Sequence, residues 1–64
     1  MRHFANKLKA ARKRAGKTQA WIAQQLNVHR TTYTKYETGQ AEPPLDVFYA
    51  LVKLLDVDPM ELLE

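Results

Sequence analysis

Hydrophobic residues recur along this chain at the spacing that amphipathic helices require. Near the amino terminus they are separated by four, three and four positions, which places them on one helical face: Phe4, Leu8, Ala11 and Ala15. Lysines and arginines occupy much of the remaining circumference, and Arg12 lies at the edge of the apolar face. The pattern predicts a first helix from Arg2 to about Ala15, ended by Gly16.

A second, shorter helix is predicted at 19–26, with Thr18 as its N-cap. Its apolar face consists of Ile22, Ala23 and Leu26. Trp21 falls outside this face, so we expect its side chain to be partly exposed. Asn27 follows the helix and tolerates the left-handed backbone conformation, which suits a tight turn into the next helix.

The stretch HRTTYTKYET, residues 29–38, has the composition of a strand and the periodicity of a helix. Threonine and tyrosine are enriched in sheets, but a strand here would mix aromatic and polar residues on both faces. A helix instead gathers His29, Tyr33 and Tyr36 on one side and the polar and cationic residues on the other. Gly39 stands where a C-cap glycine belongs. We therefore predict a helix that packing of the two tyrosines must stabilise.

The last part of the chain predicts two more helices. The prolines of QAEPP start a helix at 45–55 that is apolar on most of its circumference, so we expect it to be the central buried helix. Its predicted main stripe is Leu45, Phe48, Val52 and Leu55. Asp58, Pro59 and Glu61 form a strong start for a final helix. The predicted fold is therefore an all-α, compact five-helix bundle in a single domain, residues 1–64.

Composition excludes several classes of protein. The 64 residues contain no cysteine, which excludes disulfides and thiolate metal sites. No apolar run approaches the ~20 residues of a membrane span. The start of the chain, MRHFANKLKAARKR, has no apolar segment of the kind that signal peptides carry. We expect a soluble, cytoplasmic protein.

Motifs for catalysis are absent from the sequence. His3 and His29 lie 26 residues apart without clustered carboxylates, which argues against a metal site. Helix capping explains Asp56, Asp58 and Glu61 better than paired catalytic carboxylates do. No P-loop, glycine-rich phosphate cradle or nucleophile motif is present. We predict that the protein is not an enzyme and needs no cofactor or metal.

The charge distribution is strongly uneven. Residues 1–35 hold nine bases and no acid, whereas residues 36–64 hold seven acids and one base, so the two parts carry +9 and −6. Such asymmetry indicates a nucleic-acid or membrane face on one side of the molecule. The alternative is an ordinary solvated surface, and it applies to the basic residues of the first helix: Lys7, Lys9, Lys13 and Arg14.

Two short helices joined by a tight turn, the second polar and basic on its outer face, describe a helix-turn-helix. In TQAWIAQQLNVHRTTYTKYETGQAEPP, followed by LDVFYALVKLLDVDPMELL, the chain resembles the Cro/phage-repressor (XRE-like) helix-turn-helix family from about residue 4 to residue 63. The residues that carry the resemblance are Gln19, Ala23, Val28, Tyr36, Glu37 and Gly39. The chain departs from the family pattern at His29, where Ser or Thr is usual, at Asn27 (Gly), at Pro44 (Ser) and at Trp21 (a polar residue). The resemblance implies a lambda-repressor-like DNA-binding domain.

The resemblance also implies roles for individual residues. The helix at 29–38 would lie in the DNA major groove and read bases through His29, Arg30, Thr31, Thr34 and Lys35. Their chemistry agrees, because Arg or Lys pairs with guanine and a Thr methyl contacts a thymine methyl. Contacts to the DNA backbone would come from Gln19 and, more weakly, from Thr18, Lys17, Thr38 and Gln40. Arg12 and Glu37 resemble a family ion pair, and we assign both to structure because a partly buried charge needs a partner.

The expected function is sequence-specific binding to double-stranded DNA to regulate transcription, as a repressor. One module reads few base pairs, so we expect a homodimer on a palindromic operator. The candidate dimer surface is formed by Leu62, Leu63 and Met60, or by Tyr49. Two alternatives stay open: the antitoxin of a toxin–antitoxin pair, which also binds a toxin protein, and an adaptor between proteins that has lost DNA binding. The expected location is a bacterial or phage-type cytoplasm, at the nucleoid.

Overall fold

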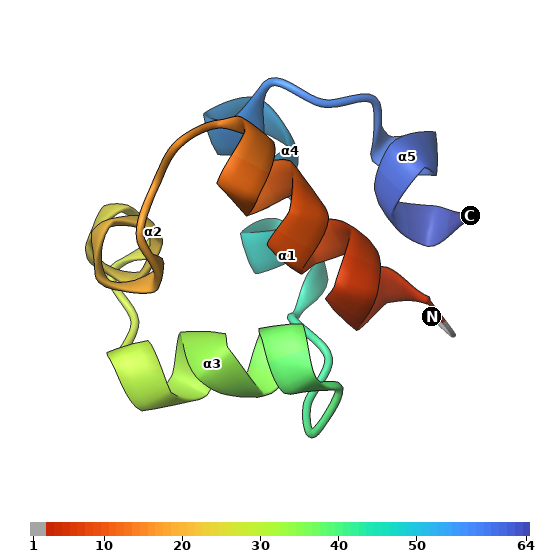
Figure 1. The fold of residues 1–64 in the computed structure, drawn as a ribbon. Coiled ribbons are helices and arrows are strands. Elements are labelled where there is room, and N and C mark those ends of the chain that lie inside the picture. Colours follow the sequence, from red (N-terminus) through yellow and green to blue (C-terminus); the bar gives the residue numbers. More distant parts are fainter. Residues whose placement is uncertain (1–2) are drawn as a thin grey trace.

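The computed structural model describes residues 3–64, which form five α-helices and, within that range, no strand. The helices are α1 (Phe4–Arg14), α2 (Gln19–Leu26), α3 (Arg30–Thr38), α4 (Leu45–Leu55) and α5 (Pro59–Leu63). Figure 1 shows α1 in the middle of the molecule, with α3 along the lower edge and α4 and α5 above. The predicted all-α, five-helix fold is confirmed.

The observed helix boundaries differ from the predicted ones only at α1 and α3. Helix α1 begins at Phe4 and ends at Arg14, and Arg2, where the sequence predicts its start, lies outside the described residues. Helix α3 begins at Arg30, because His29 takes an extended conformation (φ −67°, ψ 146°) at the N-cap position. The side chain of His29 makes no capping hydrogen bond.

Short-range chemistry explains where the helices start and stop. Thr18 Oγ1 accepts a hydrogen bond from the Trp21 amide at 3.0 Å, which caps the start of α2. Asn27 is left-handed (φ 58°), and the amide that follows it donates to Ala23 O at 3.0 Å, which closes the end of α2. Gly39 is also left-handed (φ 81°) and ends α3. The predicted caps of α2 and α3 are thus confirmed.

One hydrophobic core joins all five helices. Its buried apolar residues are Phe4, Leu8, Ala11, Ile22, Ala23, Tyr33, Tyr36, Leu51, Leu55 and Leu62. Phe48 packs on the edge of this core, with its ring centroid 5.9 Å from that of Phe4. Full burial of one leucine side chain contributes roughly 1.5–3 kcal/mol, so a domain of this size depends on every member of the cluster.

The prediction that the fourth helix is central is wrong. Helix α1 packs against both α3 and α5, whereas α4 packs most closely against α2. The predicted stripe of α4 is also wrong at Leu45, which is 82% exposed, while Leu51 is fully buried. The helical period does mark an outer face on α4, at Asp46, Tyr49 and Lys53, and Leu45 lies on that face, four residues before Tyr49.

The prediction that Leu62 of the final helix lies on the dimer surface is wrong. Leu62 is fully buried, because α5 packs against α1 and inserts this side chain into the core. Asp58 caps α5 by accepting a hydrogen bond from the Met60 amide at 2.9 Å. Within residues 3–64, no helix combines the length and hydropathy needed to cross a bilayer.

Candidate functional site

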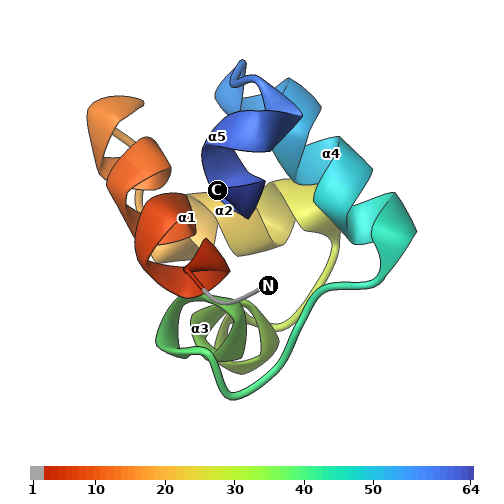
Figure 2. The ribbon, with the colours of Figure 1, turned by 90° about the vertical axis from the view of Figure 1, so that its right-hand side faces the viewer.

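Helices α2 and α3 and the turn between them form a helix-turn-helix, with α3 at one end of the molecule (Figure 1). Figure 1 and Figure 2, which are related by a quarter turn, both show α3 at the lower edge and α4 and α5 at the upper end. Helix α3 packs against α1 and α2. Its remaining circumference therefore faces away from the body of the protein.

The inner face of α3 holds it in place despite its strand-like composition. Tyr33 is fully buried, and Tyr36 is 5% exposed. Their rings meet edge to face, with centroids 6.2 Å apart, a favourable arrangement for aromatic pairs. The prediction that both tyrosines belong to the core is confirmed. Tertiary packing therefore stabilises α3 where intrinsic propensity does not.

Glu37 is the buried charged residue of the described chain, and three helices supply its hydrogen-bond donors. Arg12 of α1 donates from Nε at 2.6 Å and from Nη2 at 3.1 Å. Gln19 of α2 donates from Nε2 at 3.0 Å. Within α3, the Tyr33 hydroxyl donates to Glu37 Oε2. The Glu37 side chain is 2% exposed, and its carboxylate thus links α1, α2 and α3 through hydrogen bonds.

Glu37 and its three donors, Arg12, Gln19 and Tyr33, form a polar cluster. The hydrogen bonds of this cluster keep its titratable members in fixed protonation states. Burial raises the pKa of Glu37, but the hydrogen bonds from Arg12, Tyr33 and Gln19 outweigh this effect and hold the pKa below its usual value. Burial, followed by the hydrogen bond to Glu37, raises the pKa of Tyr33 well above that of a free tyrosine. The hydrogen bond to Glu37 also raises the pKa of Arg12. Glu37 is therefore charged and Tyr33 neutral at physiological pH.

The Gln19 side chain is oriented by the same cluster. Its Nε2 donates to Glu37, and its Oε1 accepts from Thr34 Oγ1 at 3.2 Å. Gln19 and Thr34 are both half-buried. A carboxamide has two N–H donors and two acceptor positions, so this arrangement leaves one donor of Gln19 free for a further partner.

The outer face of α3 carries most of the predicted base-reading residues. His29, Arg30, Thr31 and Lys35 are exposed, and their side chains make no hydrogen bond or ion pair within residues 3–64. Thr34 is the exception, because it is half-buried and bound to Gln19. The structure thus collects four available side chains on or beside the first two turns of α3.

The predicted backbone-contacting residues lie near both ends of the helix pair. Thr18 is exposed, although its hydroxyl is occupied as the cap of α2. The Thr38 hydroxyl donates to Lys35 O at 3.3 Å, and Gln40 is exposed just beyond Gly39. Lys17 is exposed in the turn before α2, where its carbonyl accepts a hydrogen bond from Arg12 Nη1 at 2.8 Å.

Sequence reasoning predicted the pair of Arg12 and Glu37 but missed the hydrogen bonds that join Tyr33, Gln19 and Thr34 to it. The spacing of Tyr33 and Glu37, four residues apart on one helix, is a signal for contact between their side chains. The hydrogen bond between Thr34 and Gln19 has no such signal, because it depends on how α2 crosses α3. The helical period alone places Thr34 with the outer residues.

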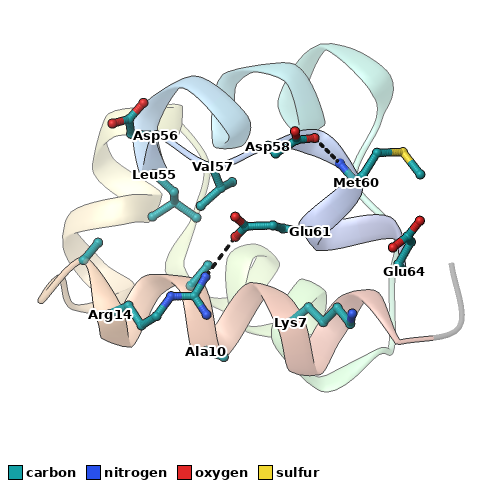
Figure 3. Close-up of a pocket in the computed structure, with 12 residues that line it drawn as sticks. Lys7, Ala10, Arg14, Leu55, Asp56, Val57, Asp58, Met60, Glu61 and Glu64 are labelled. Carbon is teal, nitrogen blue, oxygen red and sulfur yellow. Dashed lines mark hydrogen bonds and ion pairs between the residues drawn. The ribbon is translucent and has the colours of Figure 1, made fainter.

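A cleft in the described structure lies elsewhere. It measures about 880 Å³ and is bordered by α1, α5 and the segment between α4 and α5 (Figure 3). No residue of α3 lines it. Arg14 reaches across it to Glu61, with the two side chains 3.1 Å apart and both exposed. Exposed pairs of this kind contribute ~0–1 kcal/mol. No metal-binding group of three His, Asp or Glu residues occurs within residues 3–64.

Comparison with known proteins finds a matching family and a similar protein but no solved structure. A family described as "Helix-turn-helix domain" matches residues 3–64. A protein of Bacillus subtilis (strain 168), named "Uncharacterized HTH-type transcriptional regulator YqaE", is 37% identical over 54 residues, which is 84% of this chain and 47% of that protein. The chain therefore spans about half the length of this curated relative. No solved structure matches the chain.

Proposed function

The chain belongs to the XRE-like helix-turn-helix family, and on that premise we propose that it binds double-stranded DNA in a sequence-specific manner and regulates transcription. The observation that carries the proposal is the division of α3 into two faces. Its inner face is fixed by Tyr33, Tyr36 and Glu37, while its outer face presents unpaired, exposed cationic and polar side chains. To read base edges, a helix must be held rigidly and must present free hydrogen-bond donors.

In this proposal α3 is the recognition helix and lies in the major groove. Arg30 and Lys35 pair with guanine O6 and N7, and the Thr31 methyl contacts a thymine methyl. His29, at the N-cap of α3, reaches the same groove from the end of the helix. Thr34 contributes from the edge of the face, where its hydroxyl is already bound to Gln19.

Contacts to phosphates fix the register of α3 on the duplex. The free N–H of Gln19 donates to one phosphate, and Thr18, Lys17, Thr38 and Gln40 contact others. Arg12 and Glu37 act indirectly, since their pair holds the start of α2 against α3. The cationic residues of the helix-turn-helix, Lys17, Arg30 and Lys35, thus face DNA, whereas Arg14 of α1 pairs with Glu61 of α5 at the other end of the molecule (Figure 1).

We propose that the protein acts as a homodimer on a palindromic operator. One such module covers only roughly 600–1,000 Å² of DNA interface, and a second copy with two-fold symmetry doubles the sequence read. Half-sites one helical turn apart, ~34 Å, then place both recognition helices in successive major grooves. The candidate dimer surface contains Met60 and Leu63 of α5, which are 51% and 42% exposed, or Tyr49 of α4, which is 60% exposed.

Repression is the form of regulation that we propose, because occupancy of a promoter by such a dimer is sufficient to block transcription. The place of action is then the nucleoid. The proposal concerns a binding module rather than an enzyme, and the chemistry that it needs is confined to hydrogen bonds and ion pairs with DNA.

The test is selection from a pool of random-sequence DNA duplexes at two salt concentrations, followed by sequencing of the bound fraction. We expect a palindromic enriched site and an affinity that falls steeply as salt rises, since binding releases counterions from the phosphates. Salt-sensitive binding without an enriched sequence would contradict sequence specificity. Absence of binding at low salt would overturn the proposal and favour an adaptor between proteins.

A further inference from the structure

Lys17 and Trp21 form a cation–π pair at the start of α2. The Lys17 ammonium lies 4.5 Å from the centre of the indole ring. Lys17 is exposed, and Trp21 is half-buried, packed against the edge of the hydrophobic core. The ring is therefore anchored by the protein, while the ammonium above it stays in contact with solvent.

The backbone of Lys17 is held as firmly as its side chain. Its carbonyl accepts a hydrogen bond from Arg12 Nη1 at 2.8 Å, and Arg12 is in turn fixed by two hydrogen bonds to Glu37. A free lysine side chain has large rotamer freedom, which is lost when it binds a ligand. Here the carbonyl and the ammonium are both tethered before any ligand arrives.

The tethered ammonium has no anionic partner. Within residues 3–64, Lys17 forms no ion pair with a carboxylate, whereas Arg12 and Arg14 are both paired. An ammonium carries three N–H donors, so one that lies over an aromatic face can still donate to a phosphate oxygen. Lys17 thus combines a favoured position of its ammonium with unused donors.

Contacts with Arg12 and Gln19 place this pair beside the proposed recognition helix. Arg12 bridges the Lys17 carbonyl and Glu37 of α3, and Gln19, two residues after Lys17, binds both Glu37 and Thr34 of α3. The turn that carries Lys17 and the start of α2 is therefore fixed relative to the outer face of α3. A phosphate in register with α3 meets a cation at a defined place.

We propose that Trp21 is a positioning residue for DNA binding, which holds the Lys17 ammonium where it contacts a phosphate of the duplex. This inference rests on the proposed function. Trp21 itself does not touch DNA in this account. Its indole lowers the entropic cost of the Lys17–phosphate contact.

The experiment is a double-mutant cycle on DNA affinity, with a fluorescently labelled duplex that carries the site enriched from the random pool. The variants are Trp21→Leu, Trp21→Phe, Lys17→Met and the double variant Trp21→Leu/Lys17→Met. Lys53→Met is the matched control, because Lys53 also lies over an aromatic ring, 4.8 Å from that of Tyr49, but on α4. Since Tyr49 is a candidate dimer residue, the oligomeric state of this variant is compared with that of the unmodified chain. Circular dichroism melting checks that each variant is folded at the temperature of the binding assay.

We expect Trp21→Leu to lower affinity about two- to fivefold, the change that a cation–π contact of ~0.5–1 kcal/mol corresponds to. Lys17→Met lowers affinity and reduces the slope of log K against log salt by about 0.9 per bound protomer. In the Lys17→Met background, Trp21→Leu has no further effect. Trp21→Phe retains most of the affinity, and Lys53→Met leaves the affinity unchanged within about twofold.

The outcomes separate this inference from the proposed function. If Trp21→Leu lowers DNA affinity equally in the original chain and in the Lys17→Met variant, the tryptophan acts on the fold. That result would overturn the inference. An unchanged salt slope in Lys17→Met would overturn it too, while leaving the proposed function intact. Failure of the unmodified chain to bind any duplex would overturn both.

Discussion

Replacement of Tyr33 by phenylalanine tests the polar cluster that positions α3. Tyr33 is fully buried, and phenylalanine keeps its ring, so packing of the core is preserved. The change removes only the hydroxyl that donates to Glu37. Glu37 keeps its hydrogen bonds from Arg12 and Gln19, and no buried donor is left without a partner. The variant thus measures one hydrogen bond to a buried carboxylate.

The expected loss of stability is about 1.5–3 kcal/mol, the usual contribution of a hydrogen bond to a charged group. A 64-residue domain has a total free energy of unfolding of only about 3–10 kcal/mol, at roughly 0.05–0.15 kcal/mol per residue. For a domain of this size the loss lowers Tm by about 6–24 °C. Thermal and urea unfolding followed by circular dichroism measure both quantities.

The pH dependence of this loss identifies its source. Because the folded-state pKa of Glu37 is lowered, its ionised form contributes stability above the pKa of an unfolded glutamate, ~4.3, and this contribution disappears as the pH falls through the folded-state pKa. The pKa of Tyr33 is raised, so its hydroxyl stays protonated in this range. The difference in stability between the original chain and Tyr33→Phe should be constant well above the folded-state pKa of Glu37 in both chains. It should shrink as the pH falls through those two pKa values, because the unfolded-state pKa is common to both chains.

Tyr36→Phe is the matched control. Tyr36 is 5% exposed on the same helix, and its hydroxyl makes no hydrogen bond within residues 3–64. We expect this variant to lose less than about 0.5 kcal/mol, the range of substitutions that remove no specific contact. Equal losses in the two variants, or a difference between them that does not change with pH, would refute the role assigned to Glu37.

Four further substitutions test other parts of the structure. Leu62→Ala should lower the free energy of unfolding by about 2–5 kcal/mol, because it leaves a cavity where α5 packs into the core. A smaller loss in urea unfolding would contradict the full burial of Leu62. Gly39→Ala should cost about 1–2 kcal/mol from its positive φ alone, since the nearest atom to the added Cβ is 3.8 Å away; an unchanged Tm would argue against the left-handed C-cap. Arg30→Ala and Lys35→Ala should leave Tm unchanged and relax base preference, each by about 1–3 kcal/mol at one position of the site; unaltered preference in the sequenced pool would place base reading elsewhere.

The sequence predicted the existence and order of the helices because their signals are local. Thr18, Asn27, Gly39 and Asp58 mark helix ends through their own side chains or backbone preferences, and the structure agrees with each. The strand-like composition of α3 did not mislead, since the helical period separates Tyr33 and Tyr36 from the polar residues. Local signals failed for Leu62, because its burial depends on how α5 packs against α1.

The candidate site shows the same limit. Exposure of Arg30, Thr31 and Lys35 follows from the period of α3, which can be read from the sequence. The inward bond from Thr34 to Gln19 cannot be read in this way, because it is set by the crossing of two helices. The contact between Lys17 and Trp21 is a local i,i+4 arrangement, yet its link to α3 through Arg12 appears only in the folded chain.

The central claim is that the outer face of α3 meets DNA, and an NMR titration tests it most directly. Backbone amide shifts of the ¹⁵N-labelled protein would be followed while the enriched duplex is added. We expect the largest changes in α3, at Arg30, Thr31 and Lys35, and at Gln19 at the start of α2. Large changes elsewhere with α3 unaffected, or no changes at low salt, would contradict it.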